Sequence, residues 1–251
     1  MKQVKFFLVA LMAVVMGMSV TSCMNGDDNH NVTMTVPVKY NYSSFLMGDG
    51  TTKLVPTTEL GLLDGTMFII SCQYDQSQVT ANSTSIPVTL LSTPLCIDPK
   101  GNETLTQTKT EPTNPLYSLD KQQSSLVYYD KNTIVLTMPY WVKVTNSSVE
   151  DSEVKKHSFC LSYNPDEIES NATKLNLYIS HRVEDGEEST RSNFTYAYRA
   201  YSISSALYQF KEKTGKLPQY LVLKAETNSS KDELKDENGE TSVEYQYAFT
   251  E

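Results

Sequence analysis

Residues 32–42 read Val-Thr-Met-Thr-Val-Pro-Val-Lys-Tyr-Asn-Tyr, an alternation of apolar and polar residues that decides the fold. This period of two predicts a strand with one face in a core and the other in water. Pro37 has no amide proton to donate, so we expect an edge position or a bulge there. Asp49-Gly50 and Asp64-Gly65 are turn signals on the C-terminal side of this strand. Further strands are expected over residues 51–55, 66–74, 85–91 and 94–97. Short strands within residues 32–99, with no helical period, predict a small β-barrel.

The same alternation returns in the second half of the chain. Strands are expected over residues 125–129, 133–138, 140–145, 157–163, 175–183, 194–204, 220–227 and 243–249. Antiparallel strands at this spacing predict a β-sandwich over residues 124–251. One short helical turn is expected within residues 204–215, and the charged residues 231–240 are predicted to form a solvated hairpin loop. Residues 100–123 are polar and contain two prolines, which predicts an interdomain linker.

The N-terminus has the features of a lipoprotein signal peptide. Lys2 and Lys5 precede an apolar run that ends in small residues directly before Cys23. A membrane-spanning helix needs about 20 apolar residues, and this run is shorter, so residues 1–22 are predicted to be removed. Cys23 would then carry the lipid, palmitate included, as the first mature residue. The alternative is an ordinary signal peptide with an incidental cysteine.

Residues 23–31 are polar and are predicted to form a flexible tether. Asp27 and Asp28 resemble the export signal of surface lipoproteins in Bacteroidota-type bacteria. The alternative is a solvated leader that faces the periplasm. We therefore expect a cell-envelope protein that is held to the outer membrane by its lipid.

The charge of the chain argues against nucleic acid as a partner. Residues 1–22 hold two lysines and no acid, so their removal changes the formal net charge from −9 to −11. Phosphate backbones are bound by concentrated Lys and Arg, which this chain lacks. The sequence also contains no phosphate-binding loop, no metal-type cysteine pairs and no nucleophile elbow. We therefore predict a protein that is not an enzyme, with no catalytic residue, metal or cofactor.

Three cysteines remain after Cys23, at positions 72, 96 and 160. An odd number allows at most one disulfide, and one thiol stays free. Cys72 and Cys96 share the N-terminal domain and are the candidate pair in an oxidising compartment. The alternative is that all three are small apolar core residues.

The two halves together resemble the NigD-like family of bacterial lipoproteins. In the first half the resemblance lies in Gly48-Asp49-Gly50, Leu54-Val55-Pro56 and Leu63-Asp64-Gly65. In the second it lies in residues 157–161, His-Ser-Phe-Cys-Leu, and 175–181, Leu-Asn-Leu-Tyr-Ile-Ser-His. The resemblance implies an all-β chain with a small N-terminal OB-like barrel followed by a C-terminal antiparallel β-sandwich. The family is named after a bacteriocin operon, which implies a non-catalytic binding or immunity module.

The candidate histidine pair is His157 and His181. Their strands are consecutive, so antiparallel pairing is expected. A register with Phe159 opposite Ile179 puts His157 directly opposite His181, and mild acid would then disfavour the pair because two imidazolium charges repel. A two-residue slip leaves the same faces buried. The alternative is two histidines at the rim of the core that satisfy local hydrogen bonds.

Candidate ligand-facing aromatics are Tyr178, Tyr201 and Tyr220, which lie on the polar parity of their strands. Exposed tyrosines can stack on sugars, so a surface glycan-binding lipoprotein is the alternative function. The alternative is that these residues are ordinary tyrosines on a strand surface. A protein or a glycan is thus the expected ligand.

Overall fold

The computed structural model describes residues 21–22, 30–80, 82–97, 103–104, 106–107, 110–123, 125–184, 191–235 and 239–249. Two compact units are present: residues 1–101 with 127–135, and residues 102–126 with 136–251. Cys23 lies outside the described residues, as do the predicted signal peptide, except Thr21 and Ser22, and most of the predicted tether. Within the described ranges no helix is long and apolar enough to cross a membrane.

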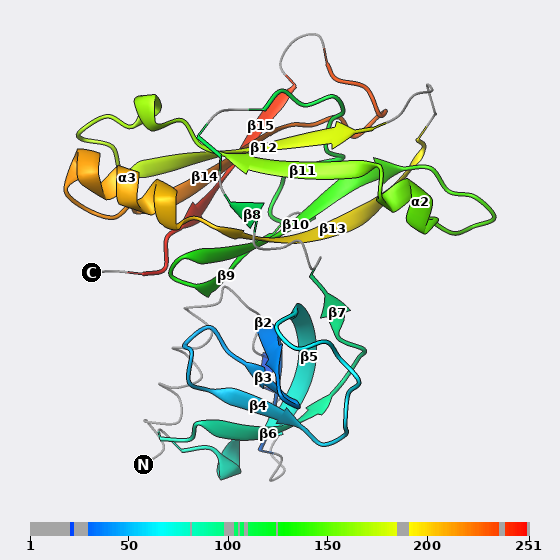
Figure 1. Cartoon of the computed structure of the whole chain (residues 1–251), viewed down its shortest axis with the longest axis vertical. Helices are drawn as coiled ribbons and strands as arrows, with labels where there is room; N and C mark the ends of the chain where they lie inside the picture. Colours follow the sequence, from blue (N-terminus) through cyan, green and yellow to red (C-terminus); the bar gives the residue numbers. More distant parts are fainter. Residues whose placement is uncertain are drawn as a thin grey trace. The chain divides into compact units, whose positions relative to one another are not determined.

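The first unit contains a closed five-strand barrel (Figure 1). Its strands are β2 (Asn31–Asn41), β3 (Ser44–Leu46), β4 (Lys53–Pro56), β5 (Met67–Asp75) and β6 (Ser85–Leu90). They follow the order β2-β3-β4-β6-β5, and antiparallel pairing of β2 with β5 closes the ring. The small barrel that the sequence predicts is therefore confirmed, in an OB-like form. Three shorter elements are attached to this unit: β1 (Thr21–Ser22), β7 (Leu95–Cys96) and the 3-10 turn η1 (Gln76–Gln78).

Alternation along β2 builds the barrel core. Val36 and Val38 point inward, whereas Lys39 is exposed. They pack with inward residues of the other strands: Phe45, Leu54, Phe68, Ile70, Cys72, Ile86 and Val88. The predicted turn at Asp49-Gly50 joins β3 to β4, and Gly50 has a φ of +72°, where a side chain would be strained. Asp49 supports the turn because its Oδ1 accepts hydrogen bonds from the amides of Thr51 and Thr52.

Two further sheets pack on each other (Figure 1). Most of their residues belong to the second unit, and residues 127–135 of one hairpin belong to the first. One sheet has the order β8 (Glu103–Thr104), β13 (Asn193–Ser202), β10 (Thr133–Val142) and β9 (Ser125–Asp130). The other has the order β11 (His157–Ser162), β12 (Lys174–Val183), β14 (Tyr220–Glu226) and β15 (Glu240–Gln246). Tyr140 of β10 packs on Phe159 of β11 with 5.1 Å between ring centroids. Tyr201 of β13 donates to the Phe159 carbonyl at 3.1 Å. The predicted sandwich is thus confirmed.

The sandwich is not purely antiparallel, because β12 and β14 are parallel. Parallel neighbours need a long crossover, which the chain makes through β13 and helix α3 (Ser204–Thr214). The prediction of one short turn in this segment is wrong: α3 is 11 residues long. It buries Ala206, Leu207 and Phe210, whose spacing is helical, and it ends at Gly215 with a φ of +75°. Two shorter elements complete the unit: α2 (Asp151–Val154) and the 3-10 turn η2 (Pro165–Glu167).

The predicted linker over residues 100–123 is wrong for its second half. Leu116 and Leu119 are buried in the second unit. The Leu116 amide donates to the Glu226 carbonyl, and the Leu116 carbonyl accepts from Asn228, each at 2.9 Å. Burial of two leucines and these backbone hydrogen bonds outweigh the polar composition of the segment.

Candidate functional site

Strands β11 and β12 bring His157 and His181 together in the interior of the sandwich. The strands pair antiparallel, but Phe159 lies opposite His181 and His157 lies opposite Val183. The predicted register is therefore wrong by two residues. A slip of two keeps the same side chains on the buried face, so parity alone does not choose between the registers. The imidazoles still meet as diagonal neighbours, with 2.9 Å between His157 Nδ1 and His181 Nε2.

The partners of the two rings define where the protons lie. His181 Nδ1 is 3.0 Å from the carbonyl oxygen of Pro115, which can only accept, so this nitrogen carries a proton. Burial and the neighbouring His157 lower the pKa of His181 to about 3, so its ring is neutral and Nε2 accepts. His157 must then donate from Nδ1. Its Nε2 lies 3.3 Å from Glu153 Oε1, and a proton there makes His157 an imidazolium.

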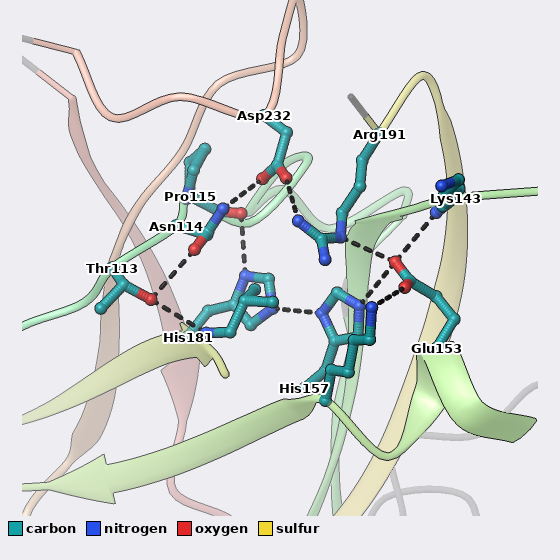
Figure 2. Close-up of polar contacts among 11 residues, drawn as sticks. Thr113, Asn114, Pro115, Lys143, Glu153, His157, His181, Arg191 and Asp232 are labelled. Carbon is teal, nitrogen blue, oxygen red and sulfur yellow. Dashed lines mark hydrogen bonds and ion pairs between the residues drawn. The ribbon is translucent and has the colours of Figure 1, made fainter. Parts of the chain in front are cut away.

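Glu153 is the anion that faces this imidazolium (Figure 2). It lies on α2, four residues before His157. Its Oε1 also accepts from the Lys143 amide at 3.0 Å and from Arg191 Nε at 2.7 Å. Burial alone would raise the pKa of Glu153, but these hydrogen bonds and the one to His157 outweigh it and leave the pKa below its ordinary value. Glu153 therefore stays ionised inside the fold.

Arg191 links Glu153 to a second carboxylate. Its Nη1 lies 3.3 Å from Asp232 Oδ2, and Asn114 Nδ2 donates to Asp232 Oδ1 at 3.0 Å (Figure 2). Burial raises the pKa of Asp232, against the opposing effect of Asn114 and Arg191. With both acids ionised and His157 protonated, the four charges sum to zero. We call Asn114, Glu153, His157, His181, Arg191 and Asp232 the buried polar cluster.

The charged side chains of the buried polar cluster are almost fully buried. The side chains of His157, Glu153, Arg191 and Asp232 are 0%, 6%, 3% and 6% exposed. All four ring nitrogens and all four carboxylate oxygens have a protein partner within 3.6 Å. In the described part of the chain, no three His, Cys, Asp or Glu side chains gather as a metal site would require. The arrangement is suited to holding α2, both β11 and β12, and two loops together.

The sequence indicated only the histidines of this cluster. Glu153 precedes His157 by four residues, and this helical spacing could have indicated that the two side chains are neighbours. Asp232 lies in the charged segment 231–240, which was predicted to be solvated, yet its side chain is buried. That prediction is wrong at this residue because Arg191 compensates its charge. Arg191 lies 38 residues from Glu153 in the sequence, and no local pattern points to it.

The predicted ligand-facing tyrosines do not form one surface. Tyr201 is buried and donates to the Phe159 carbonyl across the sandwich, and Tyr178 is buried with its hydroxyl on Glu167. The prediction is wrong for both, because η2 supplies a partner to Tyr178 and Tyr201 points between the sheets. Tyr220 is half-buried, with Lys174 Nζ 5.9 Å from its ring centroid.

The candidate disulfide is absent from the structure. Cys72 is buried, Cys96 is exposed and Cys160 is half-buried, all as free thiols. Cys96 lies opposite Phe68, four residues along β5 from Cys72, which is about 13 Å of strand. Bridged cysteines have Cα atoms within about 7 Å, so the pairing is wrong. Burial raises the pKa of the Cys72 thiol to about 12, in line with an apolar core residue.

A separate aromatic feature lies on the outer face of the β8-β13-β10-β9 sheet. Tyr117 stacks on Phe194 with ring centroids 4.3 Å apart, and Tyr196 stands edge-on to Phe194 at 5.9 Å. On the other side, Tyr117 meets Trp141 at 5.0 Å. Phe194 and Tyr196 are 41% and 40% exposed. We call Tyr117, Trp141, Phe194 and Tyr196 the aromatic row. Sequence alternation placed Phe194 and Tyr196 on one strand face, but it gave no sign of Tyr117.

The fold defines a class of all-β proteins with a closed five-strand barrel and a β-sandwich. The chain is similar to a protein described as a putative lipoprotein from Bacteroides fragilis NCTC 9343, with 30% identity and a TM-score of 0.67. The match covers 86% of this chain and 98% of that chain, so our chain belongs to the same family as that lipoprotein.

Two more distant structures share the fold alone. An uncharacterized protein from Parabacteroides merdae ATCC 43184 has 13% identity and a TM-score of 0.52, over 85% of this chain and 98% of that one. A protein of unknown function, DUF1344, from Bacteroides vulgatus ATCC 8482 has 6% identity and a TM-score of 0.50, over 86% and 90%. No protein-family model and no curated protein matches the chain.

Proposed function

We propose that this protein is a lipid-anchored lipoprotein of the cell envelope that acts by binding and not by catalysis. The observation that carries the proposal is the contrast between the two features of the second unit. The charged side chains of the buried polar cluster have protein partners and little exposure, whereas Phe194 and Tyr196 of the aromatic row are exposed. Exposed aromatic groups are typical of recognition surfaces.

The anchor is part of the same proposal. Cys23 would carry the lipid, palmitate included, and the polar residues after it would hold the body at the outer membrane, exposed on the cell surface. Membership in the same family as the Bacteroides fragilis lipoprotein supports this proposal. Stable attachment takes more than one acyl chain, which a lipoprotein cysteine supplies.

The resemblance to NigD-like lipoproteins favours immunity as the biological role. In this role the protein would bind an incoming bacteriocin at the envelope before it reaches its target. The test is a deletion strain that is challenged with culture supernatants of bacteriocin-producing relatives. We expect the wild-type gene to restore survival and Cys23→Ala to fail. Equal survival of the deletion strain and its complemented derivative against every supernatant would argue against immunity.

Glycan capture is the second candidate function, and the aromatic row specifically favours it. Sugar-binding surfaces need flat apolar rings together with polar edges, and tyrosine offers both. Immunity predicts a bacteriocin as the ligand and glycan capture predicts a sugar, so binding experiments can distinguish the two roles.

A further inference from the structure

We propose that the aromatic row is a sugar-binding platform, on which a pyranose ring stacks against Phe194 while Tyr196 forms the side wall. This inference rests on the proposed binding function and names the ligand class. It moves the predicted glycan contact away from Tyr178 and Tyr201, which are buried, to a surface on β13.

The position of the row on the outer face follows from strand parity. Arg199 and Tyr201 point into the sandwich, where both contact Phe159. Phe194 and Tyr196 have the opposite parity on β13 and therefore point outward. On β10, Tyr140 packs inward on Phe159, so its neighbour Trp141 also lies on the outer face.

The platform is held rigidly before any ligand arrives. The amide of Tyr117 donates to the Pro139 carbonyl at 2.9 Å, next to the buried Leu116. Trp141 Nε1 donates to the Asn228 carbonyl at 2.8 Å and is thereby fixed against the ring of Tyr117. A rigid aromatic surface loses little conformational entropy when a ligand binds. A ligand that gains only modest contact energy, such as a sugar, can therefore still bind to it.

The chemistry of the row matches a ligand with an apolar face and polar edges. Tyr117 covers one face of Phe194, and the 41% exposure of Phe194 leaves the remainder for a ligand. Tyr196 meets Phe194 at an interplanar angle of 84°, so the two rings form a corner. A pyranose offers C–H groups to the ring and hydroxyls to the phenol oxygens.

The two arginines nearest the aromatic row in sequence are not available to a phosphate-bearing ligand. The arginines nearest in sequence are Arg191, which is committed to the buried polar cluster, and Arg199, which lies over the inward-facing Phe159. Nucleotides need cations beside the stacking rings. Lys143, two residues after Trp141, is exposed, but an uncharged sugar can use the aromatic rings without any cation.

Native affinity gels with laminarin, xylan, dextran and yeast mannan test the proposal. The single tryptophan of the chain, Trp141, gives a second readout, because its ring contacts Tyr117 and its fluorescence should change when a sugar stacks nearby. We expect at least one polysaccharide to retard the protein, and Phe194→Ala to weaken binding about tenfold. Tyr208→Ala, at an exposed tyrosine on α3, is the matched control and should bind as the wild type does.

The outcomes separate this inference from the proposed function. Loss of sugar binding in Phe194→Ala, with an unchanged thermal midpoint, supports the platform. Sugar binding that survives Phe194→Ala overturns it and leaves a binding protein with another site. Absence of binding to all four polysaccharides also overturns it, and the bacteriocin challenge then decides the proposed function by itself. If Phe194→Ala instead abolishes protection without any sugar binding, the row is a protein-binding surface and the inference is wrong.

Discussion

His157 and His181 share a hydrogen bond of 2.9 Å although their backbones are not opposite each other. Their imidazoles meet along a diagonal of the β11–β12 ladder, with Phe159 stacked on His181 at 4.8 Å. One facing nitrogen must donate and the other must accept, so the pair cannot hold protons on both. This constraint gives the pair a defined charge state that experiment can read.

The first prediction concerns that charge state. At neutral pH we expect both nitrogens of His157 to be protonated, while His181 is neutral with its proton on Nδ1. The reason is the chain of partners from the Pro115 carbonyl through both rings to Glu153. Two-bond proton–nitrogen correlation spectra on the folded protein measure it, with His181→Asn to assign the signals. A His181 proton on Nε2, or a neutral His157, would contradict the proton order.

The second prediction is a loss of stability in acid. His181 has a pKa of about 3 in the folded protein against an ordinary 6.5, so only the unfolded chain takes up a proton on this group between these values. The contribution of His181 to the unfolding free energy is complete above about pH 6.5. It is lost as the pH falls toward 3, by about 1.4 kcal/mol per pH unit.

Urea unfolding at pH 7.5 and pH 5 measures this effect, which should be about 2 kcal/mol from His181. The difference in unfolding free energy between the wild type and His181→Asn should change by that amount between the two pH values. His30→Asn, at an exposed histidine, is the matched control. Equal pH dependence in His181→Asn and the wild type would refute the assignment of the proton uptake to His181.

The third prediction concerns the buried ion pair of Glu153 and Arg191. Glu153→Ala should cost about 3–5 kcal/mol of unfolding free energy, because His157 loses its anion and Arg191 keeps only Asp232. The double variant Glu153→Leu with Arg191→Met should cost much less than the sum of its single variants. Glu233→Ala is the control, since its pair with Lys231 is exposed and should be worth under about 1 kcal/mol. Additive single and double effects would mean that the pair is not coupled.

The fourth prediction concerns the segment that was predicted to be a linker. Leu116→Ala should destabilise the second unit by about 3 kcal/mol, because Leu116 is fully buried and its backbone connects to Glu226 and Asn228. Leu63→Ala, at a largely exposed leucine, should change the unfolding free energy by less than about 0.5 kcal/mol. Denaturant unfolding compares the two. Similar small effects of both changes would restore the linker interpretation for residues 110–123.

The sequence was informative where a local period carries the information. Alternation identified the barrel strands and the faces of β11 and β12, because a strand buries every second residue. It left the register undecided by two residues, because both registers bury Phe159 and Ile179. The buried polar cluster depends on Arg191 and Asp232, which are 38 and 79 residues from Glu153, and no short-range pattern records such separations.

The last prediction concerns the anchor, because every proposed role of the protein requires it to be held at the envelope. Cys23→Ala should prevent lipidation, since no other residue in the signal context offers a thiol for thioether formation. We expect the variant to lose palmitate label and to leave the membrane pellet, or to persist as uncleaved precursor. Cys96→Ala is the matched control, because it removes an exposed thiol from the barrel unit and should leave both label and location unchanged. If Cys23→Ala still carried the label and still sedimented with membranes, the lipid anchor would lie elsewhere and the envelope proposal would have to be rebuilt around that site.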